Sequence, residues 1–196
     1  MSYTYALVGN PNCGKTTLFN ELTGSNQYVG NWPGVTVEKK EGRLKSHGDE
    51  VTVVDLPGIY SLSPYSAEEM VTRNFILEEK PDVLVDVVDA TNIERNLYLT
   101  LQMAELGCPM VIALNMMDML KSRGMEIDVQ KLEHLLGIPV VPVAASRGRG
   151  IKELIDRAYH DGAERTAREP SNFDEQRLAA RVRQRYADNP YILHQL

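Results

Sequence analysis

The sequence is poor in the residues that mark disulfide-rich, zinc-binding and membrane-spanning proteins. It has 2 cysteines in 196 residues, Cys13 and Cys108, too few for a disulfide framework or a cysteine-ligated zinc site. Its 4 histidines are scattered and form no pair at ligand spacing. No apolar run approaches the roughly 18 residues of a membrane span, and no basic stretch followed by an apolar segment opens the chain. We therefore expect a domain from a reducing compartment, without a secretory signal.

An excess of positive charge is also missing. The chain has 21 Lys and Arg residues against 27 Asp and Glu, a formal net charge of −6. Proteins that wrap nucleic acid mainly through charge are basic, so we expect no nucleic-acid partner. The hydrophobic fraction of 43% and the charged fraction of 24% are close to the globular average, so the chain can bury a core.

Strands and helices alternate along most of the chain. Short apolar runs rich in β-branched residues predict buried strands, and apolar residues spaced three and four apart predict helices. The predicted strands are 3–9, 35–44, 50–56, 83–88, 110–114 and 138–143, with a flexible loop over 25–35. The predicted helices are 15–22, 67–79, 92–107, 128–137 and one that starts at 151. This order favours right-handed βαβ units, so we expect an α/β fold with a mostly parallel six-stranded sheet and helices on both faces.

The chain divides into one full domain and a short remainder. Residues 1–168 are expected to form the α/β domain, and the Pro-containing stretch 169–172 has the composition of a linker. Residues 171–196 carry a helical pattern but are too few for a domain, so we expect them to begin a helical appendage.

The clearest motif runs from Gly9 to Thr16, G-N-P-N-C-G-K-T, and matches the phosphate-loop pattern G-x-x-x-x-G-K-[ST]. It follows a predicted strand and precedes a predicted helix, as the motif requires. Backbone N–H groups can turn inward around phosphate oxygens, and the helix N-terminus adds partial positive charge. Lys15 supplies a point charge to the outer phosphates. The predicted phosphate contacts are Gly9, Asn10, Pro11, Asn12, Cys13, Gly14, Lys15, Thr16 and Thr17.

Two further segments point to a magnesium ion beside these phosphates. Asp55 ends a predicted strand and begins D-L-P-G; its carboxylate can hold Mg²⁺ through a water, and the Gly58 N–H can meet the γ-phosphate. Thr36 lies after the predicted flexible loop and can close onto the ion when the γ-phosphate is present. The predicted magnesium ligands are Thr16, Thr36 and Asp55, and Gly34 and Val35 are further predicted phosphate contacts.

The pattern N-x-x-D predicts the nucleobase. It occurs as Asn115-Met116-Met117-Asp118, directly after a predicted strand. A carboxylate there can accept hydrogen bonds from guanine N1–H and its exocyclic amine, a donor pair that adenine lacks. The predicted guanine contacts are Asn115, Met116, Asp118, Ala144, Ala145 and Ser146. Because these motifs follow strand after strand in this order, we expect a Ras-like P-loop GTPase fold that converts GTP and water to GDP and phosphate.

Four segments carry a closer resemblance. The sequences at 9–20, 29–38 (V-G-N-W-P-G-V-T-V-E), 55–62 (D-L-P-G-I-Y-S-L) and 115–118 strongly resemble FeoB, the family of bacterial ferrous iron transport proteins. The resemblance covers residues 3 to about 165. It implies a regulatory GTPase domain at the cytoplasmic face of the bacterial inner membrane, followed by a helical domain likened to a GDP-dissociation inhibitor and then a membrane domain that carries Fe²⁺.

Two positions depart from Ras-like signalling GTPases. Ile59 stands where those proteins place the glutamine that orients the attacking water, so we expect slow intrinsic hydrolysis. Met116 replaces the usual lysine of N-K-x-D, which should weaken guanine binding and favour fast exchange. The FeoB pattern shares both departures. The predicted catalytic residues are Lys15, Asn12, Thr36 and Gly58.

The resemblance also implies a potassium ion. Asn12 matches the phosphate-loop asparagine of potassium-activated GTPases, in which K⁺ lies between that residue, the phosphates and backbone carbonyls of the first switch loop. Here those carbonyls would come from Gly30 and Trp32, and the ion would do part of the work of an arginine finger. The alternative is that Asn12 only shapes the loop.

The resemblance names GTP or GDP and the membrane transport domain of the same polypeptide as partners, with a second copy or small accessory proteins as further ones. A soluble ribosome-assembly or tRNA-modification GTPase shares this domain class and remains an alternative, although the acidic chain and the W-P-G loop disfavour it. A nucleotide-sensing gate with negligible turnover is a third hypothesis.

Overall fold

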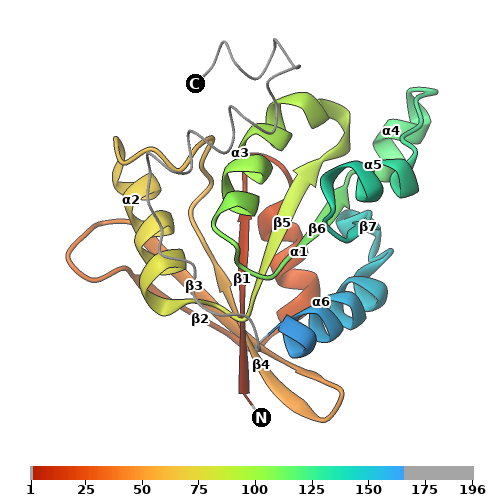
Figure 1. The fold of residues 1–196 in the computed structure, drawn as a ribbon. Coiled ribbons are helices and arrows are strands. Elements are labelled where there is room, and N and C mark those ends of the chain that lie inside the picture. The colour runs from red at the N-terminus through yellow and green to blue at the C-terminus, as the bar shows by residue number, and fades with distance from the viewer. Residues whose placement is uncertain (1, 166–196) are drawn as a thin grey trace.

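The structure, a computed structural model, describes residues 2–165 of the chain. It contains a seven-stranded sheet in the order β2-β3-β4-β1-β5-β6-β7 (Figure 1). The strands are β1 Ser2–Gly9, β2 Gln27–Asn31, β3 Glu38–Ser46, β4 Asp49–Asp55, β5 Val83–Asp89, β6 Met110–Asn115 and β7 Val140–Pro142. The helices are α1 Lys15–Thr23, α2 Ala67–Asn74, α3 Ile93–Glu105, α4 Met117–Ser122, α5 Val129–Leu136 and α6 Ile151–Arg165. The predicted appendage 171–196 lies outside the described residues.

The sheet is parallel from β4 to β7 and antiparallel at its other end. Strand β1 pairs in parallel with β4 and β5, whereas β3 pairs antiparallel with β4 and β2. The prediction of six strands and a loop over 25–35 was wrong, because Gln27–Asn31 forms the edge strand β2. An edge strand pairs on one side only, and Tyr28 and Val29 are 66% and 54% exposed, so no buried apolar pattern marks β2 in the sequence.

One helical prediction also needed correction. The helix predicted over 67–79 is α-helical only to Asn74 and continues as a π-helix over Phe75–Glu79. In α5, Leu135 is 68% exposed, whereas Leu132 and Leu136 pack against the core. Asp128 caps α5, since its carboxylate accepts from the Lys131 N–H at 3.0 Å.

Apolar side chains pack on both faces of the sheet. On one face, Leu84 and Val88 of β5 meet Leu99 and Met103 of α3. On the other, odd-numbered residues of β5 join two sets of helical residues, Leu18 and Phe19 from α1 and Leu154 and Ala158 from α6. Figure 1 shows the helices divided between these faces. The sheet is therefore buried between two layers of helices, and it fixes the positions of the loops that follow its strands.

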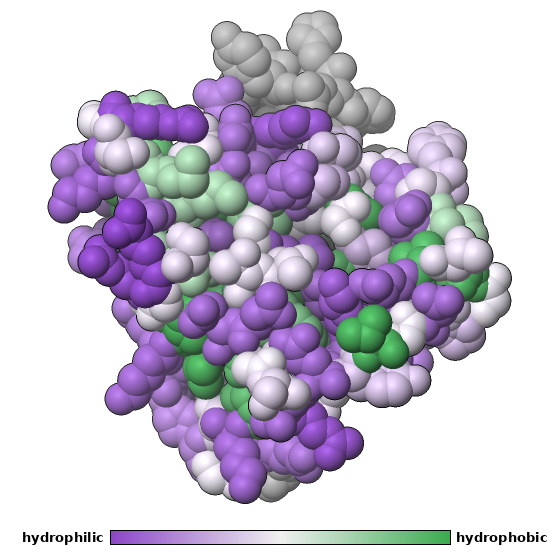
Figure 2. Space-filling view, turned by 180° about the vertical axis from the view of Figure 1, so that it is seen from behind, coloured by the Kyte–Doolittle hydropathy of each residue, from purple (hydrophilic) through white to green (hydrophobic). Residues whose placement is uncertain are grey.

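Figure 2 shows a mainly hydrophilic surface on the side turned away from Figure 1, with separate apolar patches among charged side chains. No helix within residues 2–165 is long and apolar enough to cross a bilayer.

Candidate functional site

The carboxyl ends of the central strands meet at one edge of the sheet. In register, Leu7 lies opposite Asp55 and Gly9 opposite Val87. One strand further, Asp89 lies opposite Asn115. The phosphate loop, the D-L-P-G turn and the base-reading segment therefore emerge side by side, at the edge where open α/β sheets bind their ligands.

The backbone of the phosphate loop leaves no room for a side chain at two positions, Gly9 and Gly14. At Gly9 an added Cβ would lie 2.7 Å from the Val87 carbonyl oxygen. Gly14 has φ +87° immediately before α1, and a Cβ there would collide with the Asn115 amide. Asn12 also adopts a left-handed conformation, with φ 64°, which asparagine tolerates better than most residues. This turn opens onto the N-terminus of α1, as phosphate binding requires.

Lys15 forms an ion pair with Asp55 across the loop. The Lys15 Nζ donates to Asp55 Oδ1, and their side chains are only 10% and 7% exposed. The pair joins the first residue of α1 to the last residue of β4. The Thr16 hydroxyl, one residue along α1, and the Asp55 carboxylate are hard oxygen donors of the kind Mg²⁺ prefers, so this donor set fits a magnesium ion.

The D-L-P-G turn packs directly on the phosphate loop. The Ile59 N–H donates to the Gly9 carbonyl at 3.1 Å, and a Cβ on Gly58 would lie 3.2 Å from the Pro11 Cα. The Ile59 side chain is 2% exposed and belongs to the core on the α3 side of the sheet. Ile59 thus supplies a backbone contact to the loop, and its side chain is directed into the core.

The segment between β2 and β3 forms a tight turn. The Trp32 N–H donates to the Val37 carbonyl at 2.9 Å, and the Trp32 carbonyl accepts from Val35 at 3.3 Å. Trp32 meets Phe75 edge to face at 5.4 Å, and the Lys39 Nζ lies 4.9 Å from its ring centroid. Thr36 is exposed in this turn, as is Gly34, and Gly30 pairs with Lys39 in the ladder. Movement of Thr36 onto a magnesium ion remains a proposal.

Asn115 has a role that sequence reasoning missed. Its side chain is buried, and its Nδ2 donates to the Cys13 carbonyl at 3.0 Å. Its Oδ1 accepts from the Ala145 N–H, also at 3.0 Å. The side chain therefore ties the phosphate loop to the loop after β7, and both its ends are occupied by backbone groups. The strand-ending asparagine was the available signal, but only the fold shows which backbone groups it reaches.

Cys13 contributes through its backbone. The side chain is 1% exposed, and burial raises the pKa of the Cys13 thiol to about 12, with Lys15 opposing the shift. The thiol therefore stays protonated and unreactive at neutral pH.

The base-reading carboxylate has a partner that the sequence did not reveal. The Arg147 Nε donates to Asp118 Oδ2 at 2.7 Å, with side chains 61% and 18% exposed. This bond, more than any other contact, holds the pKa of the Asp118 carboxyl below its ordinary value. Met116 caps α4 in a left-handed conformation, φ 63°. A Cβ on Gly14 would lie 3.6 Å from the Met116 methyl, so this side chain extends toward the phosphate loop.

The loop after β7 is closed on itself. The backbones of Ala144 and Arg149 exchange hydrogen bonds of 3.1 and 3.2 Å, and residues 145–147 form a 3-10 turn. Ala144 and Ala145 are buried, whereas Ser146 is exposed. The predicted guanine contacts are thus brought to one corner of the sheet edge.

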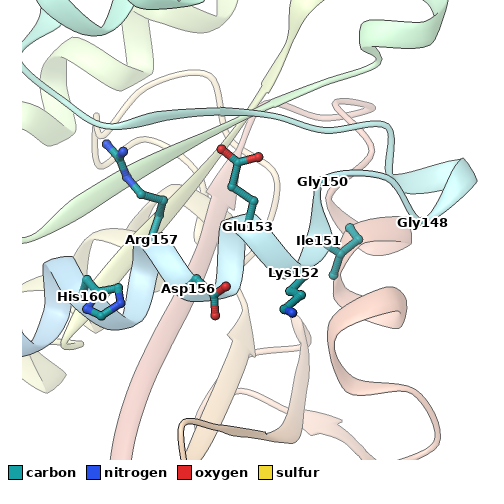
Figure 3. A pocket seen from close by; sticks show the side chains of 8 residues that line it. All are labelled: Gly148, Gly150, Ile151, Lys152, Glu153, Asp156, Arg157 and His160. Carbon is teal, nitrogen blue, oxygen red and sulfur yellow. The ribbon is translucent and has the colours of Figure 1, made fainter.

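A cavity of about 500 Å³ lies along α6 and includes none of the motif residues. Figure 3 shows the Glu153 and Arg157 side chains pointing to one side of the helix and Lys152, Asp156 and His160 to the other. Because these groups diverge rather than converge on one point, the hollow lacks the polar focus of a ligand site.

The fold and the edge arrangement define a P-loop GTPase domain. Residues 3–158 match the model of the family described as ferrous iron transport protein B, and the chain belongs to this family.

The Fe(2+) transporter FeoB of Salmonella typhimurium is 54% identical over 161 residues, which cover 79% of this chain and 21% of that protein. The chain thus spans about a fifth of the length of the curated relatives it matches. A mutant of S. thermophilus NFeoB bound to GDP is 49% identical with a TM-score of 0.80, covering 93% of this chain and 70% of that one. The FeoB G-domain from Methanococcus jannaschii is 48% identical with a TM-score of 0.74. The match covers 83% of this chain and 98% of that one.

Proposed function

We propose that this chain binds GTP in a Mg²⁺-dependent manner and hydrolyses it slowly to GDP and phosphate. The observation that carries the proposal is the Asn115 side chain, which joins the phosphate loop to the loop beside Asp118. One rigid element thus sets the distance between a phosphate site and a guanine-reading carboxylate. The relative from S. thermophilus was solved with GDP, which supports the same ligand here.

The phosphates would be held by the backbone of residues 9–17 and by Lys15, and guanine by Asp118 and the loop at 144–146. Lys15 would exchange Asp55 for phosphate oxygens, because both are anionic acceptors for the same amine. When bound, Mg²⁺ supplies charge to the transferring phosphoryl group, and Thr16, Asp55 and Thr36 would hold it.

Hydrolysis is proposed to be slow because Ile59, at the position of the water-orienting glutamine, can neither donate nor accept a hydrogen bond through its side chain. The Ile59 side chain is buried in the core, so positioning falls to the Gly58 N–H and to Thr36. We further propose that K⁺ stimulates the reaction at Asn12, with backbone carbonyls at Gly30 and Trp32. Asn12 is exposed in the phosphate loop, which supports this site.

The family suggests the larger setting. We propose that the chain is the regulatory domain of a ferrous iron transporter at the cytoplasmic face of the bacterial inner membrane. Its partners would be the transport domain of the same polypeptide and, further, a second copy or small accessory proteins, without nucleic acid. Family membership disfavours the alternative of a soluble ribosome-assembly or tRNA-modification GTPase.

Equilibrium binding of GTP and ATP tests the proposal. The wild-type chain should bind GTP in Mg²⁺ at least about a hundredfold more tightly than ATP, because the Asp118 carboxylate pairs only with guanine. Asp118→Asn should lose most of this preference and gain affinity for XTP, whose base offers the complementary acceptor. Equal binding of GTP and ATP would contradict the proposal. A nucleotide-sensing gate would show the same binding but release no phosphate in a single turnover.

A further inference from the structure

The donor edge of guanine is a guanidine. Guanine presents N1–H and the exocyclic amine, two N–H donors on nitrogens that share one carbon, C2. An arginine side chain presents the same arrangement, with Nε–H and a terminal N–H on nitrogens that share Cζ. A carboxylate that recognises one of these groups therefore recognises the other.

The structure places such a group on the carboxylate that is assigned to guanine. Arg147 donates from Nε to Asp118 Oδ2 at 2.7 Å. With Arg147 in place the Asp118 side chain is 18% exposed, whereas the Arg147 side chain is 61% exposed. The arginine therefore occupies an oxygen of the carboxylate that is assigned to the base.

The backbone that carries Arg147 is held by hydrogen bonds, whereas its side chain is 61% exposed. The 3-10 turn 145–147 is held at its start by the bond from the Ala145 N–H to Asn115, and the backbone bridge between Ala144 and Arg149 closes it. Departure of the guanidinium therefore requires only side-chain rotation and leaves the guanine-facing loop in place.

We propose that Arg147 is a competitive latch on the base site: its guanidinium mimics the guanine edge, pairs with Asp118 when the base is absent, and must leave before guanine binds. The proposal rests on the guanine site proposed above. The charge-assisted hydrogen bond stabilises the carboxylate in the empty site, and guanine must replace that bond when it binds. Arg147 thereby weakens guanine-nucleotide affinity and speeds nucleotide release.

The test measures GDP affinity and the dissociation rate of a fluorescent GDP analogue from the 196-residue chain. Arg147→Ala should bind GDP about two- to fivefold more tightly and release it correspondingly more slowly, the range expected for a partly exposed ion pair. Arg147→Lys should lie between the two, because it keeps a charge without the paired donors. Arg149→Ala is the matched control, because Arg149 is exposed on the same loop. Its hydrogen bonds to Ala144 are made by the backbone and survive the substitution, so wild-type GDP affinity is expected.

A second arm isolates the pairing with Asp118. In an Asp118→Asn background, measured with xanthosine diphosphate, Arg147→Ala should change affinity by less than its effect in the wild-type background. The latch is overturned if Arg147→Ala leaves GDP affinity unchanged or lowers it, or if Arg149→Ala tightens binding equally. A wild-type chain that fails to bind GDP would instead overturn the proposed function, so the two failures are distinguishable.

Discussion

Asn115 donates to the Cys13 carbonyl at one end of its side chain and accepts from the Ala145 N–H at the other, both at 3.0 Å. Two loops that are 132 positions apart in sequence are thereby fixed at one distance (from 13 to 145). Nucleotide recognition needs that distance to be constant, because phosphates and base are covalently joined.

Asn115→Ala should weaken both the fold and the nucleotide site. It leaves two buried backbone groups without partners, at a cost of about 1–3 kcal/mol each when no water replaces the amide. We expect a lower free energy of unfolding in urea and a loss of GDP affinity of about tenfold or more. Asn96→Ala, which removes a buried asparagine that bonds the Asp89 N–H and the Asn92 carbonyl rather than the phosphate loop itself, is a control: it should destabilise the fold without a comparable loss of affinity.

Gly14→Ala should damage the site more than the fold. Alanine is strained at φ +87°, and its Cβ would displace the Asn115 amide. We expect GDP affinity to fall by at least about tenfold, with a smaller change in unfolding temperature. Gly24→Ala provides the comparison, since Gly24 has φ +57° and no atom within 4 Å of an added Cβ. If both variants bind GDP equally, contact with Asn115 is not what requires glycine at position 14.

The buried carboxyl of Asp86 should make stability depend on pH. Asp86 lies in β5 at 1% exposure and accepts from the Thr100 hydroxyl at 2.5 Å. Burial raises the pKa of the Asp86 carboxyl from 3.8 to about 7, and the Thr100 bond opposes this only in part. Below about pH 4 the group is protonated in both folded and unfolded chains. Between pH 4 and 7 only the unfolded chain ionises, so its contribution to folding stability falls as pH rises.

Asp86→Asn removes that dependence. The variant should be more stable than wild type at pH 8, by an amount on the order of 1–3 kcal/mol, the cost of an ion in the core. The difference should vanish near pH 4. Urea unfolding of both proteins across this range measures it. A constant difference at all pH values would show that packing, rather than ionisation, distinguishes the two side chains.

Trp32 is the one tryptophan in the sequence and should report the state of the turn that carries Thr36. It is packed edge to face on Phe75 at 5.4 Å. If Thr36 closes onto Mg²⁺ when a γ-phosphate is present, the turn must move and the Trp32 environment must change. We expect a shift in fluorescence emission with a non-hydrolysable GTP analogue that GDP does not produce, and its loss in Thr36→Ala. Identical spectra with both nucleotides would argue against this closure.

Asn12→Ala tests the potassium proposal. Wild-type turnover should be faster in K⁺ than in Na⁺ at equal ionic strength, and the variant should turn over at the same slow rate in both salts. If Asn12 only shapes the loop, wild type will show no preference between the salts. Asn12→Gly, which relieves the left-handed conformation, distinguishes a backbone effect from loss of the amide.

The features that depend on a few neighbouring residues could be predicted from the sequence. Phosphate loop, D-L-P-G turn and N-x-x-D segment each combine a strand end with residues of special backbone or charge, and the fold brings them to one edge. The sequence predicted poorly what depends on partners distant along the chain. Strand β2 has no buried face to produce an alternating pattern, since Tyr28 and Val29 are exposed. The π-helical continuation of α2 likewise was not distinguished in the sequence, which predicted a single helix over 67–79.

The same limit applied within the site. Asn115 and Arg147 are ordinary residues in sequence, one at a strand end and one in a Gly-rich loop. Their roles come from what the fold places opposite them, a carbonyl at Cys13 and a carboxylate at Asp118. For Ile59, the sequence alone shows that the side chain has no polar group. Only the fold shows that this side chain is buried.

Phosphate release from GTP in a single turnover shows whether this chain is a GTPase. With the chain in excess over GTP, in Mg²⁺ and K⁺, wild type should release phosphate slowly but completely, whereas Lys15→Ala should release it at the rate of GTP alone. Asp118→Asn, which disables base recognition while leaving the phosphate loop intact, should reduce release from GTP and restore it with XTP. Wild-type GTP binding without phosphate release above the Lys15→Ala background would contradict the account and leave a nucleotide-binding domain without catalytic function.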